Sequence, residues 1–269
     1  MRFSGSWCAT GRRPMTVEAC AEIVRRGDPD RFRAAMAAPV AARARLFPLY
    51  AFNVEVARAP WVTEEPMIAE MRLQWWRDVL EEIAGAGPVR RHEVATPLAA
   101  VLGRDEAVLL DGLVAARRWD AYRDPFADSA AFDAHIDATS GHLLWVAARV
   151  LGASHGEAPL RDLGYAMGVA NWLVAVPELT ARGRQPLVDR CPEAVGALAR
   201  AALDRLGAAL AARGEVPREA VPAARAAWAA GPILRRAAED PRRVEEGALA
   251  PSEFRRRAGL LWRAVTGRW

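Results

Sequence analysis

Apolar side chains return every three or four residues along most of the chain, and no segment shows the alternation typical of a β-strand. The turn signal Asp28-Pro29-Asp30 ends a first short helix and caps a second one. Further helices are predicted over residues 39–58, 63–85, 96–119, 129–151, 157–176, 192–213, 217–230, 231–239 and 252–266. The loops between them are short and no flexible linker interrupts them, so the pattern predicts one all-α domain.

The helix predicted over 63–85 has apolar residues at every fourth position. They are Met67, Met71, Trp75, Val79 and Ile83. Such spacing predicts one broad buried face.

Composition narrows the chemistry. All 37 basic residues are arginines, which excludes a Schiff-base lysine or a phosphate-loop lysine. The three cysteines are far apart and odd in number, which excludes a disulfide framework and a cysteine-rich zinc site and indicates a reducing compartment. No apolar run is long enough to span a bilayer, so we expect a cytoplasmic protein, with peripheral attachment to the inner face of a membrane as an alternative.

Positive charge gathers at the two ends of the chain. Residues 1–14 carry three arginines and no acid, and are predicted to form a disordered leader before a helical domain over 15–269. Residues 252–269 carry five arginines against Glu253. Because the body between these ends is slightly acidic, the sequence pI of about 9.5 does not indicate a nucleic-acid partner.

Two groups of acids have a spacing that could hold Mg²⁺. Asp133 and Asp137 lie four residues apart and share a helix face, as do members of the group Asp78, Glu81 and Glu82. For both groups a solvated helix surface is the alternative interpretation, and we favour it.

Neither the histidines nor the paired glycines form a recognisable ligand motif. His135 and His142 are two helical turns apart, and we favour a partly buried pair over metal ligation. The Gly164–Gly168 pair predicts close helix packing rather than a phosphate-binding loop.

Four segments occur in the order found in the squalene/phytoene synthase family, which this chain resembles from about residue 20 to 190. They are residues 43–55 with Tyr50-Ala51-Phe52, residues 71–78, residues 139–152, and residues 164–187 ending in Gly-Arg-Gln-Pro-Leu. The resemblance implies an isoprenoid-synthase-like helical bundle with a central cavity.

Active members of that family carry two Asp-rich motifs, each holding Mg²⁺ against the diphosphate of an isoprenoid substrate. In this chain the first motif falls on Ala57, Arg58 and Trp61, and the second falls on Glu178 and Leu179. Glu55 and Glu178 are the carboxylates nearest to the two sites, one for each. Because ionisation of an allylic diphosphate needs a metal cluster, the resemblance implies that catalysis is lost, with no catalytic residue, metal or other cofactor.

The segment Phe52-Asn53-Val54-Glu55, followed by Met71 to Trp76, is more similar to a non-catalytic branch of the family. That branch contains a mitochondrial assembly factor for respiratory complex I. It implies binding of a protein client, either a complex I subunit or an assembly intermediate.

Two other functions remain open at this stage. One is an active prenyltransferase that condenses polyprenyl diphosphates, with Mg²⁺ held by Asp133 and Asp137 or by Glu55 and Glu178. The other is a carrier of isoprenoid or other lipid.

Two further sets of residues are candidates for contact with ligands or partners. Aromatic and aliphatic residues expected to line the cavity, with core packing as the favoured alternative, are Phe52, Trp76, Leu143, Trp145, Val169, Trp172 and Leu173. Residues of the last helix expected to dock on a membrane or an acidic partner, with packing on the body as the alternative, are Phe254, Arg255, Arg256, Arg257, Leu261 and Trp262.

Overall fold

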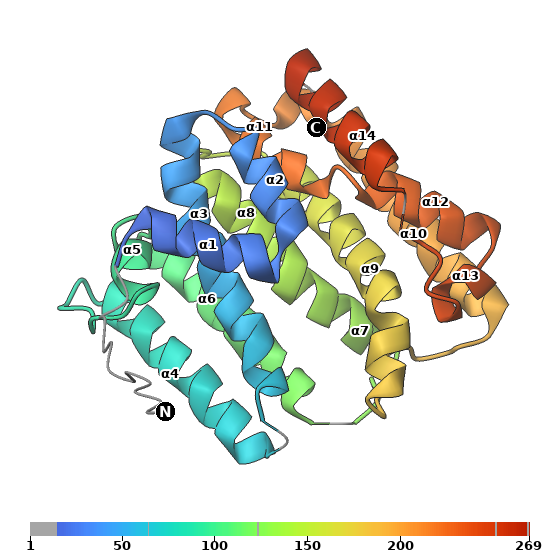
Figure 1. The fold of residues 1–269 in the computed structure, drawn as a ribbon, viewed down its shortest axis with the longest axis horizontal. Helices are drawn as coiled ribbons and strands as arrows, with labels where there is room; N and C mark the ends of the chain where they lie inside the picture. Colours follow the sequence, from blue (N-terminus) through green and yellow to red (C-terminus); the bar gives the residue numbers. More distant parts are fainter. Residues whose placement is uncertain (1–14, 64, 123, 251, 268) are drawn as a thin grey trace, which may run out of the picture.

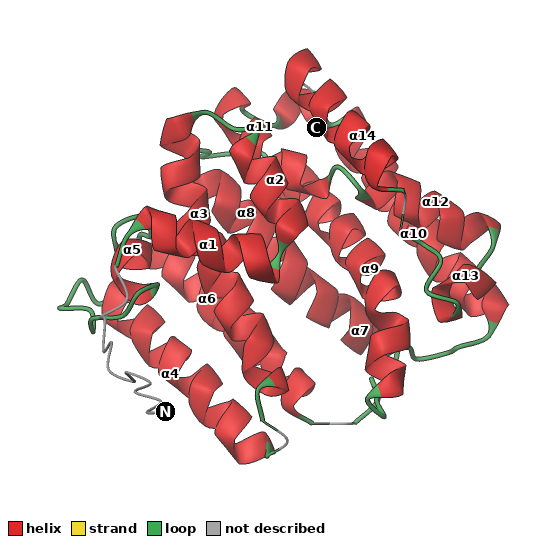
Figure 2. Cartoon of the chain, viewed as in Figure 1, coloured by secondary structure: helices red, strands yellow, loops and turns green. Residues whose placement is uncertain are grey.

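The structure, a computed structural model, describes residues 15–269 except 64, 123, 251 and 268, and omits the side chains of 253–257. The predicted leader, residues 1–14, lies outside the described residues. The described part contains helices and no strand (Figures 1 and 2). The α-helices are α1 (Val17–Gly27), α2 (Pro29–Met36), α3 (Val40–Arg58), α4 (Pro66–Ala84), α5 (Ala95–Ala99), α6 (Arg104–Ala116), α7 (Ser129–Ile136), α8 (His142–Val150), α9 (Glu157–Ala181), α10 (Pro192–Ala211), α11 (Val221–Ala224), α12 (Ala230–Glu239), α13 (Arg242–Glu245) and α14 (Glu253–Thr266). None of them is long and apolar enough to cross a membrane.

The cap signal at Asp28 is confirmed by the structure. Asp28 ends α1 and also caps α2, because its carboxylate accepts a hydrogen bond from the amide of Arg31 at 3.0 Å. The single helix predicted over 96–119 is wrong, since α5 and α6 are separate. Gly103 is extended there, and its amide donates to the side chain of Glu106, which starts α6 anew.

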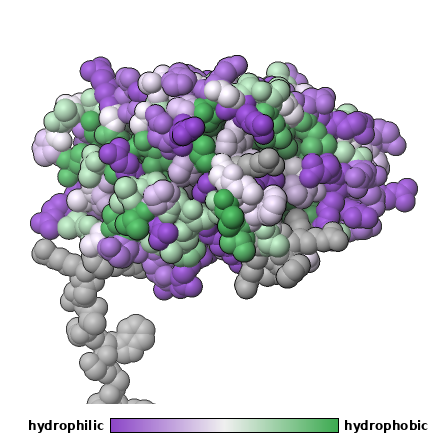
Figure 3. Space-filling model, turned by 90° about the horizontal axis from the view of Figure 1, so that it is seen from above, coloured by the Kyte–Doolittle hydropathy of each residue, from purple (hydrophilic) through white to green (hydrophobic). Residues whose placement is uncertain are grey.

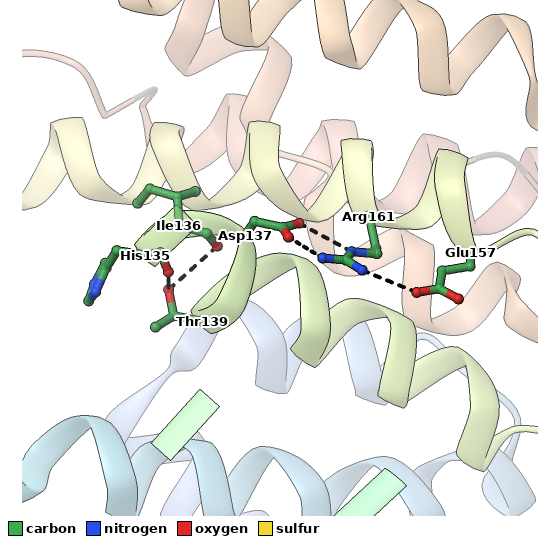
Figure 4. A network of polar contacts seen from close by, with 6 residues as sticks. All are labelled: His135, Ile136, Asp137, Thr139, Glu157 and Arg161. Carbon is green, nitrogen blue, oxygen red and sulfur yellow. Dashed lines mark hydrogen bonds and ion pairs between the residues drawn. The ribbon is translucent and has the colours of Figure 1, made fainter. Parts of the chain in front are cut away.

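The long helix predicted over 129–151 is present but contains a π-helical turn, η3 (Asp137–Gly141), between α7 and α8. In this turn the amide of His142 donates to the carbonyl of Asp137, five residues earlier. The hydroxyl of Thr139 donates to the carbonyl of His135 at 2.7 Å, which satisfies a carbonyl near the wider turn (Figure 4).

Helix α9 lies in the middle of the bundle, between α8 on one side and α10 and α12 on the other (Figure 1). A Cβ atom on Gly164 would lie 2.8 Å from the backbone of Ser140 and Gly141, and one on Gly168 would lie 2.7 Å from Ile136 and Ser140. Gly164 therefore lets α9 touch η3 backbone to backbone, and Gly168 leaves room for the side chains of Ile136 and Ser140, which is the close packing that the sequence predicts.

The buried face of α4 differs from the predicted one. Val79 and Ile83 are buried as expected, but Met67 and Met71 are 73% and 66% exposed. Residues four apart in an α-helix are rotated by about 40° relative to one another, so a four-residue repeat drifts around the helix. The residues of α4 that are buried are Ala69, Leu73, Trp76, Val79, Leu80 and Ile83.

Candidate functional site in the central cavity

A cavity of about 430 Å³ lies among α2, α3, α9 and the turns that follow α1 and α6. Its volume is in the range of small-molecule sites. Its wall is polar near the α1–α2 turn and η2 (Arg117–Ala121) and mostly apolar along α9. The residues that line it are Gly27, Asp28, Asp30, Arg31, Asn53, Val54, Ala57, Arg58, Trp61, Arg117, Asp120, Ile136, Thr139, Ser140, Met167, Gly168, Asn171, Trp172, Ala175, Leu179, Ala226, Trp228, Ala229 and Ala230.

Each of the three carboxylates on the cavity wall has an arginine partner. Asp28 pairs with Arg31 at 2.5 Å, and Asp120, which is 3% exposed, pairs with Arg117 at 3.0 Å. Asp30 pairs with an arginine that lies outside the cavity lining, Arg33, at 3.2 Å. A metal ion would have to compete with these guanidinium groups for the same oxygens.

The structure brings the positions of the first motif to this cavity. Asn53, Ala57 and Arg58 reach the wall from α3, and Trp61 does so from η1 (Ala59–Trp61). Glu55, which is on α3 as well, does not line the cavity.

The positions of the second motif diverge. Leu179 lines the cavity from α9, whereas Glu178 is exposed and pairs with Arg182 at 2.5 Å. Glu55 and Glu178 are therefore not opposed across the cavity wall.

Trp61 is held by two arginines from the loop after α9. The guanidinium carbons of Arg182 and Arg184 lie 4.8 Å and 4.6 Å from the centre of its ring. Arg184 is 9% exposed and also donates to the backbone carbonyls of Asp120 and Tyr122. These contacts fasten the loop after α9 to the end of η2, beside the cavity.

Of the candidate cavity residues, Trp172 lies on the wall, and its indole nitrogen donates to the carbonyl of Pro186 at 2.8 Å. The six others do not line the cavity and are buried in the hydrophobic core, to which Trp172 also belongs. They are Phe52, Trp76, Leu143, Trp145, Val169 and Leu173. They belong to the helices expected to face the cavity, but their side chains point into the packing between helices.

The acids proposed for the alternative enzyme lie elsewhere. Asp133 accepts a hydrogen bond from the hydroxyl of Tyr165 at 2.5 Å, and Asp137 pairs with Arg161 (Figure 4). Arg161 also contacts Glu157 at 3.2 Å. The acids and Arg161 line an open surface hollow rather than the central cavity.

The second acidic group is also bound up in surface contacts. Asp78 accepts from Gln74 at 2.8 Å, and Glu82 pairs with Arg90 at 2.5 Å. In the part of the chain that the structure describes, no three histidine, cysteine or acidic side chains converge as metal ligands would.

His135 lies in an aromatic cluster behind the cavity wall. Its ring is 5.4 to 5.5 Å from those of Trp119, Phe126 and Trp172. Burial lowers the pKa of His135 to about 4. The neutral ring is thus the form that the fold accommodates.

This burial predicts a pH dependence of stability. In the unfolded chain His135 takes up a proton near its ordinary pKa of 6.5, whereas the folded chain resists it until about 4. Protons therefore favour unfolding in this window, and stability should fall as the pH drops from 6.5 to 4, by up to about 3 kcal/mol from this residue. Urea unfolding at several pH values should show a shallower fall for His135→Gln than for the wild type. Equal slopes for the two proteins would contradict the assignment.

Several residues of the cavity wall carry no local signal in the sequence. Arg117 and Asp120 come from η2, and Trp228 comes from an alanine-rich segment beyond the family resemblance. Asn171 and Ala175 are one turn apart on α9, upstream of the position expected for the second motif. Only the regular spacing of α9 could have pointed to these last two, through Leu179 four residues further on.

The arrangement of helices is similar to that of a solved dehydrosqualene synthase structure in complex with a ligand. The TM-score is 0.73, and the match covers 93% of this chain and 95% of the other, at 15% sequence identity. The chain therefore has the all-helical fold of the isoprenoid synthases.

The profile of the squalene/phytoene synthase family matches residues 24–189, and the chain belongs to this family. Among curated relatives, complex I assembly factor 6 of Bos taurus is 26% identical over 180 residues, covering 61% of this chain and 50% of that protein. The human protein of the same name is 26% identical over 162 residues, covering 59% and 48%. The chain spans about half the length of these curated relatives.

Proposed function

We propose that this protein supports the assembly of respiratory complex I by binding a client and not by turnover. The observation that carries the proposal is the similarity to proteins named complex I assembly factor 6, which extends over more than half of this chain. The client would be a complex I subunit or an assembly intermediate.

The chemistry of the cavity supports the non-catalytic part of the proposal. Loss of pyrophosphate from a prenyl diphosphate separates charge, and Mg²⁺ held by opposed carboxylates neutralises the leaving group. At the expected places the wall carries Ala57, Trp61 and Leu179, none of which can bind a metal. Asp28 and Asp120 already neutralise arginines.

A direct assay tests this part of the proposal. Purified protein incubated with Mg²⁺ and farnesyl or geranylgeranyl diphosphate should release no pyrophosphate above the rate without protein. A dehydrosqualene synthase assayed in parallel is the positive control. Enzyme-dependent release would favour the active prenyltransferase instead.

A deletion experiment tests the role in assembly. In the organism that encodes the protein, deletion of its gene should reduce the amount of assembled complex I seen on a native gel, and the wild-type gene should restore it. Intact complex I together with loss of an isoprenoid product would contradict the proposal. An isoprenoid lipid that copurifies with the protein, with complex I intact in the deletion strain, would favour the carrier.

A further inference from the structure

Helix α14 presents an uncharged apolar face to solvent over its last turns. Leu261 and Trp262 are each 65% exposed and Val265 is 76% exposed, while Leu260 is 8% exposed and faces the body. Ala258 is exposed on the same outer side as Leu261 and Val265. A surface helix normally turns polar and charged residues toward solvent. The outer face of α14 is apolar instead, and exposed apolar patches of this kind indicate a contact with a partner or a membrane.

The position of α14 leaves this face accessible. The helix lies at the outer edge of the molecule, on the side opposite α4 (Figure 1). The view onto that side shows hydrophobic side chains in separate groups among hydrophilic ones (Figure 3). The side chains of Phe254, Arg255, Arg256 and Arg257 lie outside the described residues, so the surface is defined here by Ala258, Leu261, Trp262 and Val265, and is called the α14 face.

The segment that contains α14 also carries positive charge. Residues 252–269 contain five arginines and one acid. Because the arginines outnumber the acid, this end of the chain attracts anionic surfaces.

We propose that the α14 face docks on an anionic lipid bilayer, with Leu261, Trp262 and Val265 entering the interface and the arginines of residues 252–269 providing the attraction to lipid phosphates. Charge complementarity decides between occupants. A lipid surface offers both an apolar layer and a dense array of phosphates, and this combination matches an exposed tryptophan on an arginine-rich helix. The docking does not rest on the proposed function, since vesicle binding can be measured in the absence of any client.

Vesicle sedimentation with the full chain tests the docking. The protein should bind vesicles of phosphatidylcholine mixed with phosphatidylglycerol, bind pure phosphatidylcholine vesicles much more weakly, and lose binding as salt is added. The double variant Leu261→Ser with Val265→Ser should bind the mixed vesicles at least about tenfold more weakly than the wild type, because two apolar side chains no longer enter the interface. Both substituted side chains are largely exposed to solvent, so the fold should be unchanged by circular dichroism.

The exposed methionines of α4 provide the matched control. Met67→Ser with Met71→Ser removes two large apolar side chains of similar exposure from the opposite side of the molecule, and should leave vesicle binding as in the wild type. Equal binding by the α14 variant and the wild type would overturn the proposal. So would absence of binding to the mixed vesicles, or a dimer in light scattering that the α14 variant converts to a monomer, since a second copy would then cover the face.

Discussion

Replacing Gly164 with alanine is expected to destabilise the folded protein by about 2 kcal/mol or more, although alanine is the better helix former. The added methyl group would lie 2.8 Å from the carbonyl oxygen of Ser140 and from the Cα of Gly141. Both neighbours are backbone atoms of η3 and cannot move aside as the end of a long side chain could. Relief would require α9 to separate from η3, along with the core residues packed between them. Urea unfolding measures the loss.

Gly207, on α10, is the control for this substitution. It is also a helical glycine, but it is exposed and nothing lies within 4 Å of the place where its Cβ would be. Gly207→Ala should therefore stabilise the protein, by up to about 1 kcal/mol, through the gain in helix propensity alone. If both variants shifted stability in the same direction, contact between α9 and η3 would not be the cause.

The second large effect is expected at Arg184. Replacement by alanine should cost about 2 to 4 kcal/mol, because the carbonyls of Asp120 and Tyr122 would lose their donor in a largely buried place and Trp61 would lose a stacked guanidinium. Thermal unfolding should show a lower Tm. The loop after α9 should also become more susceptible to proteolysis, since its attachment to η2 is lost.

Arg182 is the matched residue for that experiment. It lies over the same ring of Trp61 at nearly the same distance, but it is exposed and its ion pair with Glu178 is a surface one. Arg182→Ala should change stability by about 0.5 kcal/mol or less. Comparable losses for the two variants would mean that stacking on Trp61, and not the buried carbonyls, accounts for the effect of Arg184.

The sequence predicts the fold well where local chemistry decides the structure. Asp28 has a side chain that can cap a helix and it precedes a proline, so the sequence predicts both the end of α1 and the start of α2. The close approach of α9 to η3 is also predictable, since Gly164 and Gly168 are two small residues one helical turn apart. The break between α5 and α6 is harder to predict, because it depends on the side chain of Glu106 accepting a hydrogen bond from the amide of Gly103.

The candidate site is less predictable, because its wall is assembled from distant segments. The family resemblance locates Ala57, Trp61 and Leu179, since these positions follow a motif. It does not reveal that Asp120 and Arg117 complete the wall, because a pairing inside the cavity depends on how η2 packs against α9. Trp172 lines the cavity and its neighbour Leu173 does not, because a rotation of about 100° separates them on α9.

The π-helical turn between α7 and α8 contains one residue more than an uninterrupted α-helix of the same length would, because its hydrogen bond spans five residues where an α-helix spans four. Excising a single residue such as Ala138 would therefore leave an ordinary α-helix, with α8 kept close to its present rotation about the axis of α7. Removing a residue from within α8, where no wider turn compensates, would instead turn the rest of that helix by about 100°. The five-residue turn is thus a place where the chain takes up an additional residue while Trp145 and its neighbours stay in the core.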